Sequence, residues 1–376
     1  MFSGDLEILV VKGGGCLEKF SCRTQIVSGA GSTAYLSQLG CRRLLMVTDP
    51  FFAQNGVADR LLKLSGAEYT AVFDKIEPDP SVELAAEGTA LVRSFQPDTV
   101  VALGGGSAMD CAKAMVYFSE LPVRLVAIPT TSGSGSEVTD FAVLTCKKVK
   151  HPLVDQRICP QVAILDGELL TQLPKGLIAD AGFDVLCHAA EAYVAKGAGA
   201  VTDALAKEAF AITFALLPAS YTGNISVRER IHNAATMAGM AFTQAGLGLC
   251  HAMTHSLGGV FHIPHGRLGA ILLPAVIECN SHLCGAKYAT LARGAGIAGS
   301  ADAMALRNLK NGLVRLRREL GMPQTLKEAG IDPREVRFHS EQIVEAALKD
   351  PCCKTNPIPV EDFMVRRILE EVTGRG

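Results

Sequence analysis

Short runs of β-branched and apolar residues, each ending in a polar or glycine-containing turn, recur between about residues 20 and 170. These runs are RRLLMVTD, EYTAVFD, DTVVALGGG, RLVAIPTT and VAILD. Each has the length and composition of a buried strand, and helical patterns lie between them. Strands that alternate with helices form a parallel sheet, so this part of the chain is predicted to fold as an α/β domain.

The local composition of the sequence changes near Pro174. Alanine- and leucine-rich stretches such as DALAKEAFAITFALLP and IHNAATMAGMAFTQAG follow, and these are typical of buried or amphipathic helices. At 376 residues the chain is also longer than one hydrophobic core usually supports. We therefore predict a Rossmann-like, parallel-sheet nucleotide-binding domain over residues 1–173 and an all-helical metal-binding domain over residues 174–376.

The composition favours an ordinary soluble globular protein. Charged residues make up 20% of the chain and the net charge is −2, so no basic field exists to attract nucleic acid. The sequence has no unbroken apolar run of about 18 residues, and its N-terminus lacks a basic leader, which argues against a membrane or export. We expect a cytoplasmic protein whose twelve cysteines are reduced thiols.

Two glycine-rich turns follow successive predicted strands. The first holds Gly104, Gly105 and Gly106, and the helix after it is predicted to open at Ser107 with Asp110 completing a capping box. The second, TTSGSGSE, combines the hydroxyls of Thr130, Thr131 and Ser134 with glycines. Glycines alone serve tight turns, but two such turns at neighbouring strand ends favour a crevice that binds a dinucleotide.

Asp49 stands at the end of the run RRLLMVTD. A carboxylate there can accept hydrogen bonds from an adenosine ribose and repel a 2′-phosphate, which would favour NAD over NADP. It can equally serve as the N-cap of a helix that begins at Pro50. Composition alone does not separate the two interpretations.

Histidines crowd the stretch CHAMTHSLGGVFHIPHG, residues 250–266. His251 and His255 are four residues apart, as are Asp184 and His188 in GFDVLCHAAEAY, so each pair shares a helix face. Three histidines and one carboxylate can bind a divalent metal, and this donor set suits iron and zinc equally. The alternative is a set of histidines with no common partner.

Several motifs together resemble one family. GGGSAMDCAK, IPTTSGSGSEVT, DAGFDVLCHAAEAY, QAGLGLCHAMTHSLGG and IPHGRLGAILLP occur in the order found in the iron-containing (group III) alcohol dehydrogenases. The resemblance spans roughly residues 22 to 370. Within the family, GGGSAMDCAKAMVYFS and FHIPHG are similar to the 1-propanol and ethanol dehydrogenases of bacterial propanediol and ethanolamine use.

The resemblance implies roles for individual residues. The family's metal ligands fall on Asp184, His188, His251 and His265, its non-ligating histidine near substrate and nicotinamide falls on His255, and His262 is a bystander. Positions expected to line NAD are Asp49, Gly105, Gly106, Ser107, Thr130, Thr131 and Ser134, with Lys150 near the ribose. Phe141 and Cys352 fall at the substrate pocket, although Cys352 can equally be an inert buried thiol.

The resemblance implies an NAD-linked alcohol dehydrogenase that interconverts short primary alcohols and aldehydes at an Fe²⁺ or Zn²⁺ site. It also implies a homo-oligomer, and it leaves association with a bacterial microcompartment open; the N-terminal LEILVVKGGG is typical of a strand and turn rather than a targeting helix. Two alternatives remain, a non-catalytic binding protein and a lyase of the dehydroquinate synthase type. The lyase needs several basic residues around a substrate phosphate, whereas only Arg267 adjoins the histidines.

Overall fold

The computed structural model describes residues 18–146 and 149–374, and the N-terminal LEILVVKGGG lies outside them. The N-terminal half is built on a six-stranded parallel sheet with the order β1-β8-β5-β4-β2-β3. Its strands are β1 (Gln25–Ser28), β2 (Arg43–Thr48), β3 (Tyr69–Phe73), β4 (Thr99–Gly104), β5 (Arg124–Pro129) and β8 (Val162–Leu165). All five predicted strands are confirmed, whereas β1 was not predicted.

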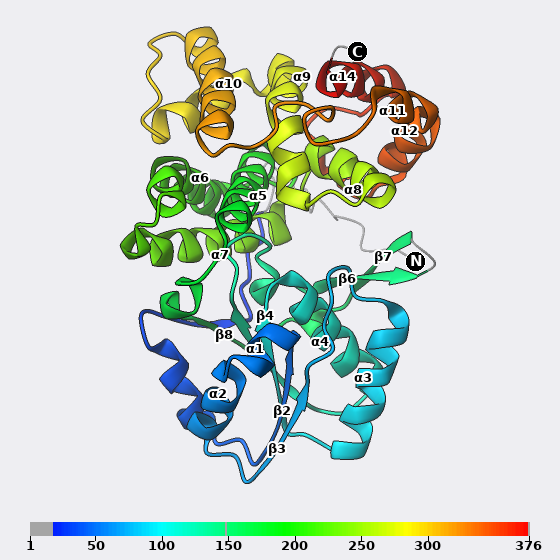
Figure 1. The fold of residues 1–376 in the computed structure, drawn as a ribbon. Helices are drawn as coiled ribbons and strands as arrows, with labels where there is room; N and C mark the ends of the chain where they lie inside the picture. Colours follow the sequence, from blue (N-terminus) through cyan, green and yellow to red (C-terminus); the bar gives the residue numbers. More distant parts are fainter. Residues whose placement is uncertain (1–17, 147–148, 375–376) are drawn as a thin grey trace, which may run out of the picture.

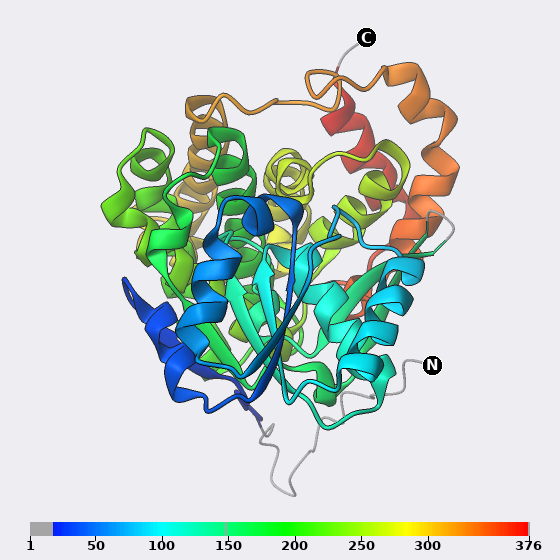
Figure 2. The same ribbon diagram turned by 60° about the horizontal axis from the view of Figure 1, so that its bottom comes forward.

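The sheet is covered on both faces. Leu45 and Val47 of β2 pack toward α3 (Val82–Phe95) and α4 (Gly106–Ser119), and their neighbours Leu44 and Met46 pack toward α2 (Val57–Ser65) and η1 (Ser32–Gln38). Figure 2 shows the blue and cyan helices on opposite sides of the strands. Alternate residues of a strand point to opposite faces, so a strand buried on both sides is apolar throughout.

A second sheet, the antiparallel hairpin β6 (Phe141–Cys146) and β7 (Val149–Val154), was not predicted either. It leaves the main sheet beside α4 and extends toward the helical half (Figure 1). The hairpin matters for function because Phe141 and Lys150 lie on its two strands.

The C-terminal half is helical, as predicted, and lies above the sheet in Figure 1. Its longer helices are α5 (Lys175–Val194), α6 (Ala200–Tyr221), α7 (Arg228–Ala245), α8 (Leu249–Phe261), α9 (His265–Gly294), α10 (Asp302–Glu319), α12 (Ser340–Lys349) and α14 (Asp362–Thr373), with α11 (Pro333–Phe338) and α13 (Cys352–Thr355) between them. Pro174 caps α5, and the division into domains 1–173 and 174–376 stays a prediction.

By length and composition α9 would suit a membrane span, but 61% of its most apolar stretch is buried in the protein. It packs against α5, α8 and α10, so it is a core helix of this half. The strands β2, β4 and β5 are parallel, so their carboxyl ends lie at the same end of the sheet. That end faces α5 and α9 (Figure 1). This arrangement brings the predicted glycine turns toward the helical half.

Candidate metal centre and nucleotide crevice

A crevice of about 380 Å³ lies between the strand ends and helices α5 and α9. This volume is within the roughly 300–1,000 Å³ of ligand pockets. Of the residues predicted to bind NAD, the crevice is lined by Asp49, Gly105, Gly106, Ser107, Thr131 and Ser134. Asp184 and His265, which were predicted as metal ligands, line the same crevice.

Two predicted NAD residues lie outside this lining. Thr130 is buried, and its backbone N–H donates to the Gly104 carbonyl at 2.9 Å, so it ties the two glycine turns together. Lys150 on β7 forms an ion pair with Asp79 at 2.8 Å. The structure therefore brings most of the predicted cofactor set together and leaves these two at its margin.

The glycines of the first turn allow a close approach of the second. A Cβ at Gly105 would lie 3.2 Å from the Thr131 hydroxyl, and one at Gly106 would lie 3.3 Å from Ser134. The predicted capping box, however, is wrong. Helix α4 begins at Gly106 with no side-chain cap, and Asp110 instead accepts hydrogen bonds from Ser136 Oγ and Val143 N. The first N–H groups of α4 therefore have no side-chain cap, and such free donors can bind an anion at this turn.

The second turn is held against α7. Ser132 Oγ lies 3.0 Å from His232 Nδ1, and Glu137 accepts a hydrogen bond from Thr236 Oγ at 2.5 Å. His232 and Thr236 are one helical turn apart, so both face the loop. Burial lowers the pKa of His232 to about 4, which keeps its imidazole neutral.

The predicted metal ligands converge from three helices. Asp184 and His188 lie on α5, His251 lies on α8, and His265 begins α9. The Nε2 atoms of His251 and His265 each lie 4.0 Å from Asp184 Oδ1, and one ligand atom from each of Asp184, His188 and His251 lies within 4.8 Å of the others. Metal–ligand bonds of roughly 2.0–2.2 Å span ligand separations up to roughly 4.4 Å, so the two 4.0 Å contacts of Asp184 lie within reach of one cation. His265 is not part of the three-residue group and adjoins it through Asp184.

Unpaired buried atoms indicate that the donor set fits a cation. His188 Nδ1 and His251 Nε2 are buried without a hydrogen-bond partner among the described residues. Burial raises the pKa of Asp184 and lowers the pKa values of His251 and His265 well below their usual range. Neutral imidazoles are ready to ligate, and a bound cation would offset the cost of burying the Asp184 charge.

Glu191 was missed by the sequence analysis. Its carboxylate accepts hydrogen bonds from the backbone N–H groups of Cys250 and His251, and its Oε2 lies 2.5 Å from His251 Nδ1. Burial raises its pKa to about 7. It lies seven residues after Asp184 on α5, and this helical spacing was the available signal.

His255 points its Nδ1 at Asp350 Oδ2, 2.8 Å away, and the other carboxylate oxygen of Asp350 accepts the N–H of Cys352 at 2.9 Å. Burial alone would raise the pKa of Asp350, but the bonds from His255 and Cys352 hold it below its usual value. The His255 ring is 5.1 Å from that of His265. A histidine oriented by a carboxylate beside the metal cluster is suited to moving a proton.

Aromatic rings connect the predicted substrate pocket to the metal cluster. Phe141 packs on Phe242 with ring centroids 6.1 Å apart, and Phe242 stacks on His188 at 4.4 Å. The backbone carbonyl of Phe141 is held by the buried ammonium of Lys113 at 2.8 Å. Phe141 is therefore fixed one ring away from a predicted ligand.

The remaining residues near the cluster have structural partners. His262 is exposed and is the C-cap of α8 with a left-handed backbone (φ 54). Arg267 forms a two-bond ion pair with Asp180, at 2.8 and 3.1 Å. A Cβ at Gly266 would lie 1.8 Å from the Asp180 carbonyl, so only glycine lets α9 start this close to α5.

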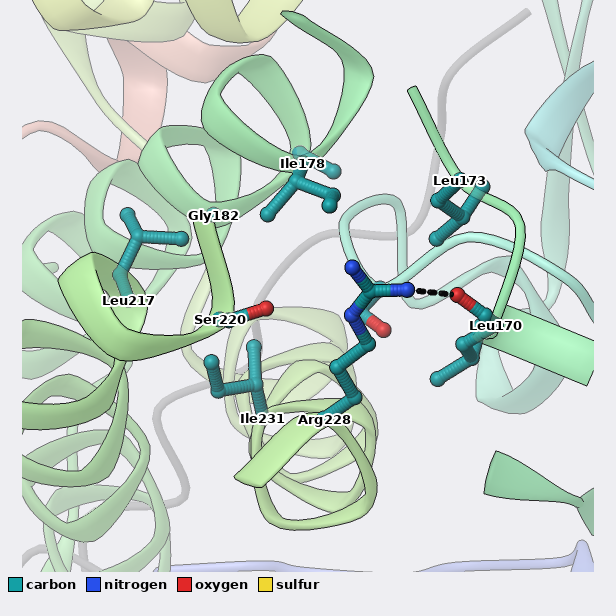
Figure 3. A pocket seen from close by; sticks show the side chains of 10 residues that line it. Leu170, Leu173, Ile178, Gly182, Leu217, Ser220, Arg228 and Ile231 are labelled. Atoms are coloured by element: carbon teal, nitrogen blue, oxygen red, sulfur yellow. Dashed lines mark hydrogen bonds between the residues drawn. The ribbon is translucent and has the colours of Figure 1, made fainter. Parts of the chain in front are cut away.

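A second, much smaller cavity lies beside α5 and shares Ala181 with the lining of the crevice. Figure 3 shows the small cavity. The Arg228 guanidinium reaches into it and donates to the carbonyls of Leu170 and Thr171. Around it lie apolar side chains that include Ile178 and Leu217. None of the residues predicted for the site lines this cavity, and Arg228 caps the end of η4 (Gly167–Leu170) from within it.

Comparison with known proteins agrees with this geometry. The family model for iron-containing alcohol dehydrogenases matches residues 23–167, and the model for the C-terminal part of that family matches residues 178–373. A 1-propanol dehydrogenase of Salmonella typhimurium is 40% identical over 95% of this chain and all of its own, and an NADPH-dependent butanol dehydrogenase of Clostridium saccharobutylicum is 38% identical over 94% and 97%.

Solved structures give the same result. A 1,3-propanediol oxidoreductase superposes with a TM-score of 0.89 at 32% identity, over 95% of this chain and all of that one. A sulfoacetaldehyde reductase from Bifidobacterium kashiwanohense in complex with NAD⁺ does so with a TM-score of 0.87 at 28% identity, over 96% and 100%. The chain therefore belongs to the iron-containing alcohol dehydrogenases, a family of oxidoreductases that uses iron and NAD.

Proposed function

We propose that this enzyme interconverts short-chain primary alcohols and aldehydes, of the ethanol and 1-propanol type, with NAD(H) and Fe²⁺. The observation that carries the proposal is that Asp184 and His265 line the same crevice as the glycine turn at Gly105 and Gly106. Hydride transfer needs the nicotinamide and the substrate carbon in near-attack contact, and a shared crevice supplies that proximity.

The proposed ligands are Asp184, His188, His251 and His265. A bound divalent ion would supply Lewis acidity toward the oxygen of the alcohol or aldehyde. The chain's own contribution is to keep the imidazoles neutral, to fix His251 through Glu191, and to bring donors of α5 and α8 together with His265 of α9 beside Asp184. The donor set accepts Zn²⁺ as well as Fe²⁺.

His255 is proposed to move the substrate proton toward solvent. Its Nδ1 is held by Asp350 at 2.8 Å, which leaves Nε2 to exchange protons, and its side chain is 33% exposed. A partly exposed imidazole beside a buried cluster connects the reacting oxygen with water.

Asp49 favours NAD over NADP in this proposal. Its Oδ1 accepts the N–H of Phe52 and so caps α1 (Pro50–Gln54), whereas Oδ2 has no hydrogen bond in the part of the chain that the structure describes. The two sequence interpretations are therefore compatible, since one oxygen can cap the helix while the other faces a ribose. The relative named as NADPH-dependent makes the choice of coenzyme a point to measure.

The substrate is proposed to lie between Phe141 and Cys352, with Ser107, Thr130, Thr131, Ser134 and Lys150 proposed around the cofactor. The lyase alternative is not favoured, because the relatives are dehydrogenases and Arg267 is already paired with Asp180. The non-catalytic alternative is disfavoured because all four predicted ligand positions and both glycine turns are present in the sequence. We further propose a cytoplasmic homo-oligomer, with association with a bacterial microcompartment as a finer hypothesis.

The test is anaerobic reduction of propanal and acetaldehyde by NADH, with metal-stripped protein to which Fe²⁺ or Zn²⁺ is restored. We expect activity to return with Fe²⁺. Binding of NAD and metal without reduction of either aldehyde would contradict the proposed substrate class, and release of phosphate from a phosphorylated substrate would favour the lyase. Repeating the assay with NADPH measures the coenzyme preference directly.

A further inference from the structure

A second group of metal-binding side chains adjoins the proposed metal centre. One ligand atom from each of His255, Asp350 and Cys352 lies within 4.8 Å of the others. This group shares no residue with the cluster of Asp184, His188 and His251. It differs in chemistry as well, because it adds a sulfur donor to one nitrogen and one carboxylate oxygen.

Asp350 organises the group. This residue is the C-cap of α12, and its two carboxylate oxygens hold His255 Nδ1 at 2.8 Å and the Cys352 N–H at 2.9 Å. The carboxylate therefore fixes the imidazole of α8 and the start of α13 at the same time. Donors that are already positioned lose little conformational freedom when an ion binds.

The donor types select the ion. Thiolate and imidazole ligands suit borderline cations such as Zn²⁺ and Co²⁺, whereas Mg²⁺ and Ca²⁺ prefer oxygen ligands. Zinc sites that are not structural usually have three protein ligands, and the fourth coordination position is open to water or another ligand. The three donors are partly exposed rather than sealed in the core, so an ion can reach them.

We propose that His255, Asp350 and Cys352 form a second, inhibitory site for a thiophilic divalent cation such as Zn²⁺. The ion takes the place of the hydrogen between His255 Nδ1 and Asp350, so the neutral imidazole carries its one proton on Nε2, and the Cys352 thiol releases its proton to solvent. The inhibitory part rests on the proposed function, since an ion on His255 removes the imidazole that would carry the substrate proton. The His255 and His265 rings are 5.1 Å apart, so the two ions would occupy adjoining sites.

Cobalt distinguishes the two sites without any enzyme assay. Metal-stripped, full-length protein is titrated with Co²⁺ under anaerobic conditions and its absorption is recorded. The proposed first site has only nitrogen and oxygen donors, so its cobalt complex lacks a thiolate-to-metal charge-transfer band. We expect a second equivalent of cobalt to produce that near-ultraviolet band.

Neighbouring cysteines provide the matched variants. Cys352→Ser is expected to bind one equivalent and lose the band, whereas Cys353→Ser is expected to keep both, because Cys353 Sγ faces the Ala347 carbonyl at 3.0 Å. Asp350→Asn keeps an acceptor for the Cys352 N–H. It is expected to lower the affinity for the second equivalent of Co²⁺ and to leave the affinity for the first unchanged. A single equivalent in the wild type, or a band that persists in Cys352→Ser, would overturn the second site.

The inhibition is then read separately. Relative to each protein's own rate with one equivalent of metal, a second equivalent of Zn²⁺ is expected to slow the wild type and Cys353→Ser but not Cys352→Ser. Equal slowing of all three would overturn the inhibitory role. The cobalt spectra need no substrate, so an inactive wild type would count against the proposed function and leave the test of the second site intact.

Discussion

His251 Nδ1 and Glu191 Oε2 lie 2.5 Å apart, and their side chains are only 3% and 1% exposed. The same carboxylate also receives two backbone N–H groups from the first turn of α8. One residue of α5 therefore orients a proposed ligand and caps the helix that carries it. This pairing couples the position of His251 Nε2 to the packing of α5 against α8.

Replacement of Glu191 by glutamine should weaken metal binding. The amide keeps the size of the side chain but loses the charge and turns one acceptor into a donor, so it cannot satisfy all three N–H groups. Loss of such a partner typically lowers metal affinity by about 10–100-fold. Competition with a calibrated chelator measures the affinity, and Glu208→Gln on the exposed face of α6 is the control. Equal affinities in both variants would show that Glu191 does not position His251.

Replacement of His255 by alanine should lower turnover while the first equivalent of metal stays bound. The imidazole is a proposed proton carrier rather than a ligand of the first site, and such groups contribute about 10²–10⁴-fold to rate. Steady-state kinetics and metal analysis of the same sample provide the two readouts, and added imidazole should restore part of the rate. His262→Asn is the matched control, because asparagine tolerates the left-handed backbone of that position. Loss of the first metal in His255→Ala would make His255 a ligand.

Replacement of Gly266 by alanine should disrupt the site through the backbone alone. The new Cβ would meet the Asp180 carbonyl at 1.8 Å, so α9 must move away from α5 and take His265 with it. Gly285→Ala on the same helix is the control, since nothing lies within 4 Å of its Cβ. That control should be neutral or stabilising by about 0.5–1 kcal/mol. Thermal unfolding with and without metal separates lost stability from lost binding, and a Gly266→Ala protein with normal metal affinity would contradict the argument.

The sequence was most informative where a local pattern determined the structure. The strands β2, β4, β5 and β8 are apolar on both faces and end in recognisable turns, so they could be predicted. Strand β1 has four residues, most of them exposed, and β7 carries polar residues such as Lys150, so neither shows an apolar run. Strand β6 is mostly apolar with alternate residues buried, and it was missed all the same. The capping box was wrong because Asp110 found partners in Ser136 and Val143, which are distant in the sequence.

The site divides in the same way. Spacing of four residues indicated the pairs on α5 and α8, and the resemblance supplied the set of four ligands. The partners Glu191 and Asp350 are 60 and 95 residues from the histidines that they orient. No short motif reports a contact over that distance, and only the packing of α5 against α8 and of α12 beside α8 creates it.

His232 should make the protein sensitive to mild acid. Its pKa is about 4 in the folded chain against a usual value of 6.5, because burial disfavours the imidazolium. Between these values the unfolded chain binds more protons, so the free energy of unfolding is highest above about pH 6.5, falls as the pH drops, and levels off near pH 4. The difference of about 2.5 between the pKa values corresponds to about 3 kcal/mol in the free energy of unfolding.

Urea unfolding from about pH 7.5 to about pH 4.5 should therefore show a shallower pH dependence of the unfolding free energy in His232→Gln than in the wild type. The exposed His282 on α9 is the control, since its imidazole is hydrated in both states and His282→Gln should keep the wild-type slope. Parallel slopes in the wild type and His232→Gln would mean that other groups cause the acid sensitivity and that the contact with Ser132 survives protonation.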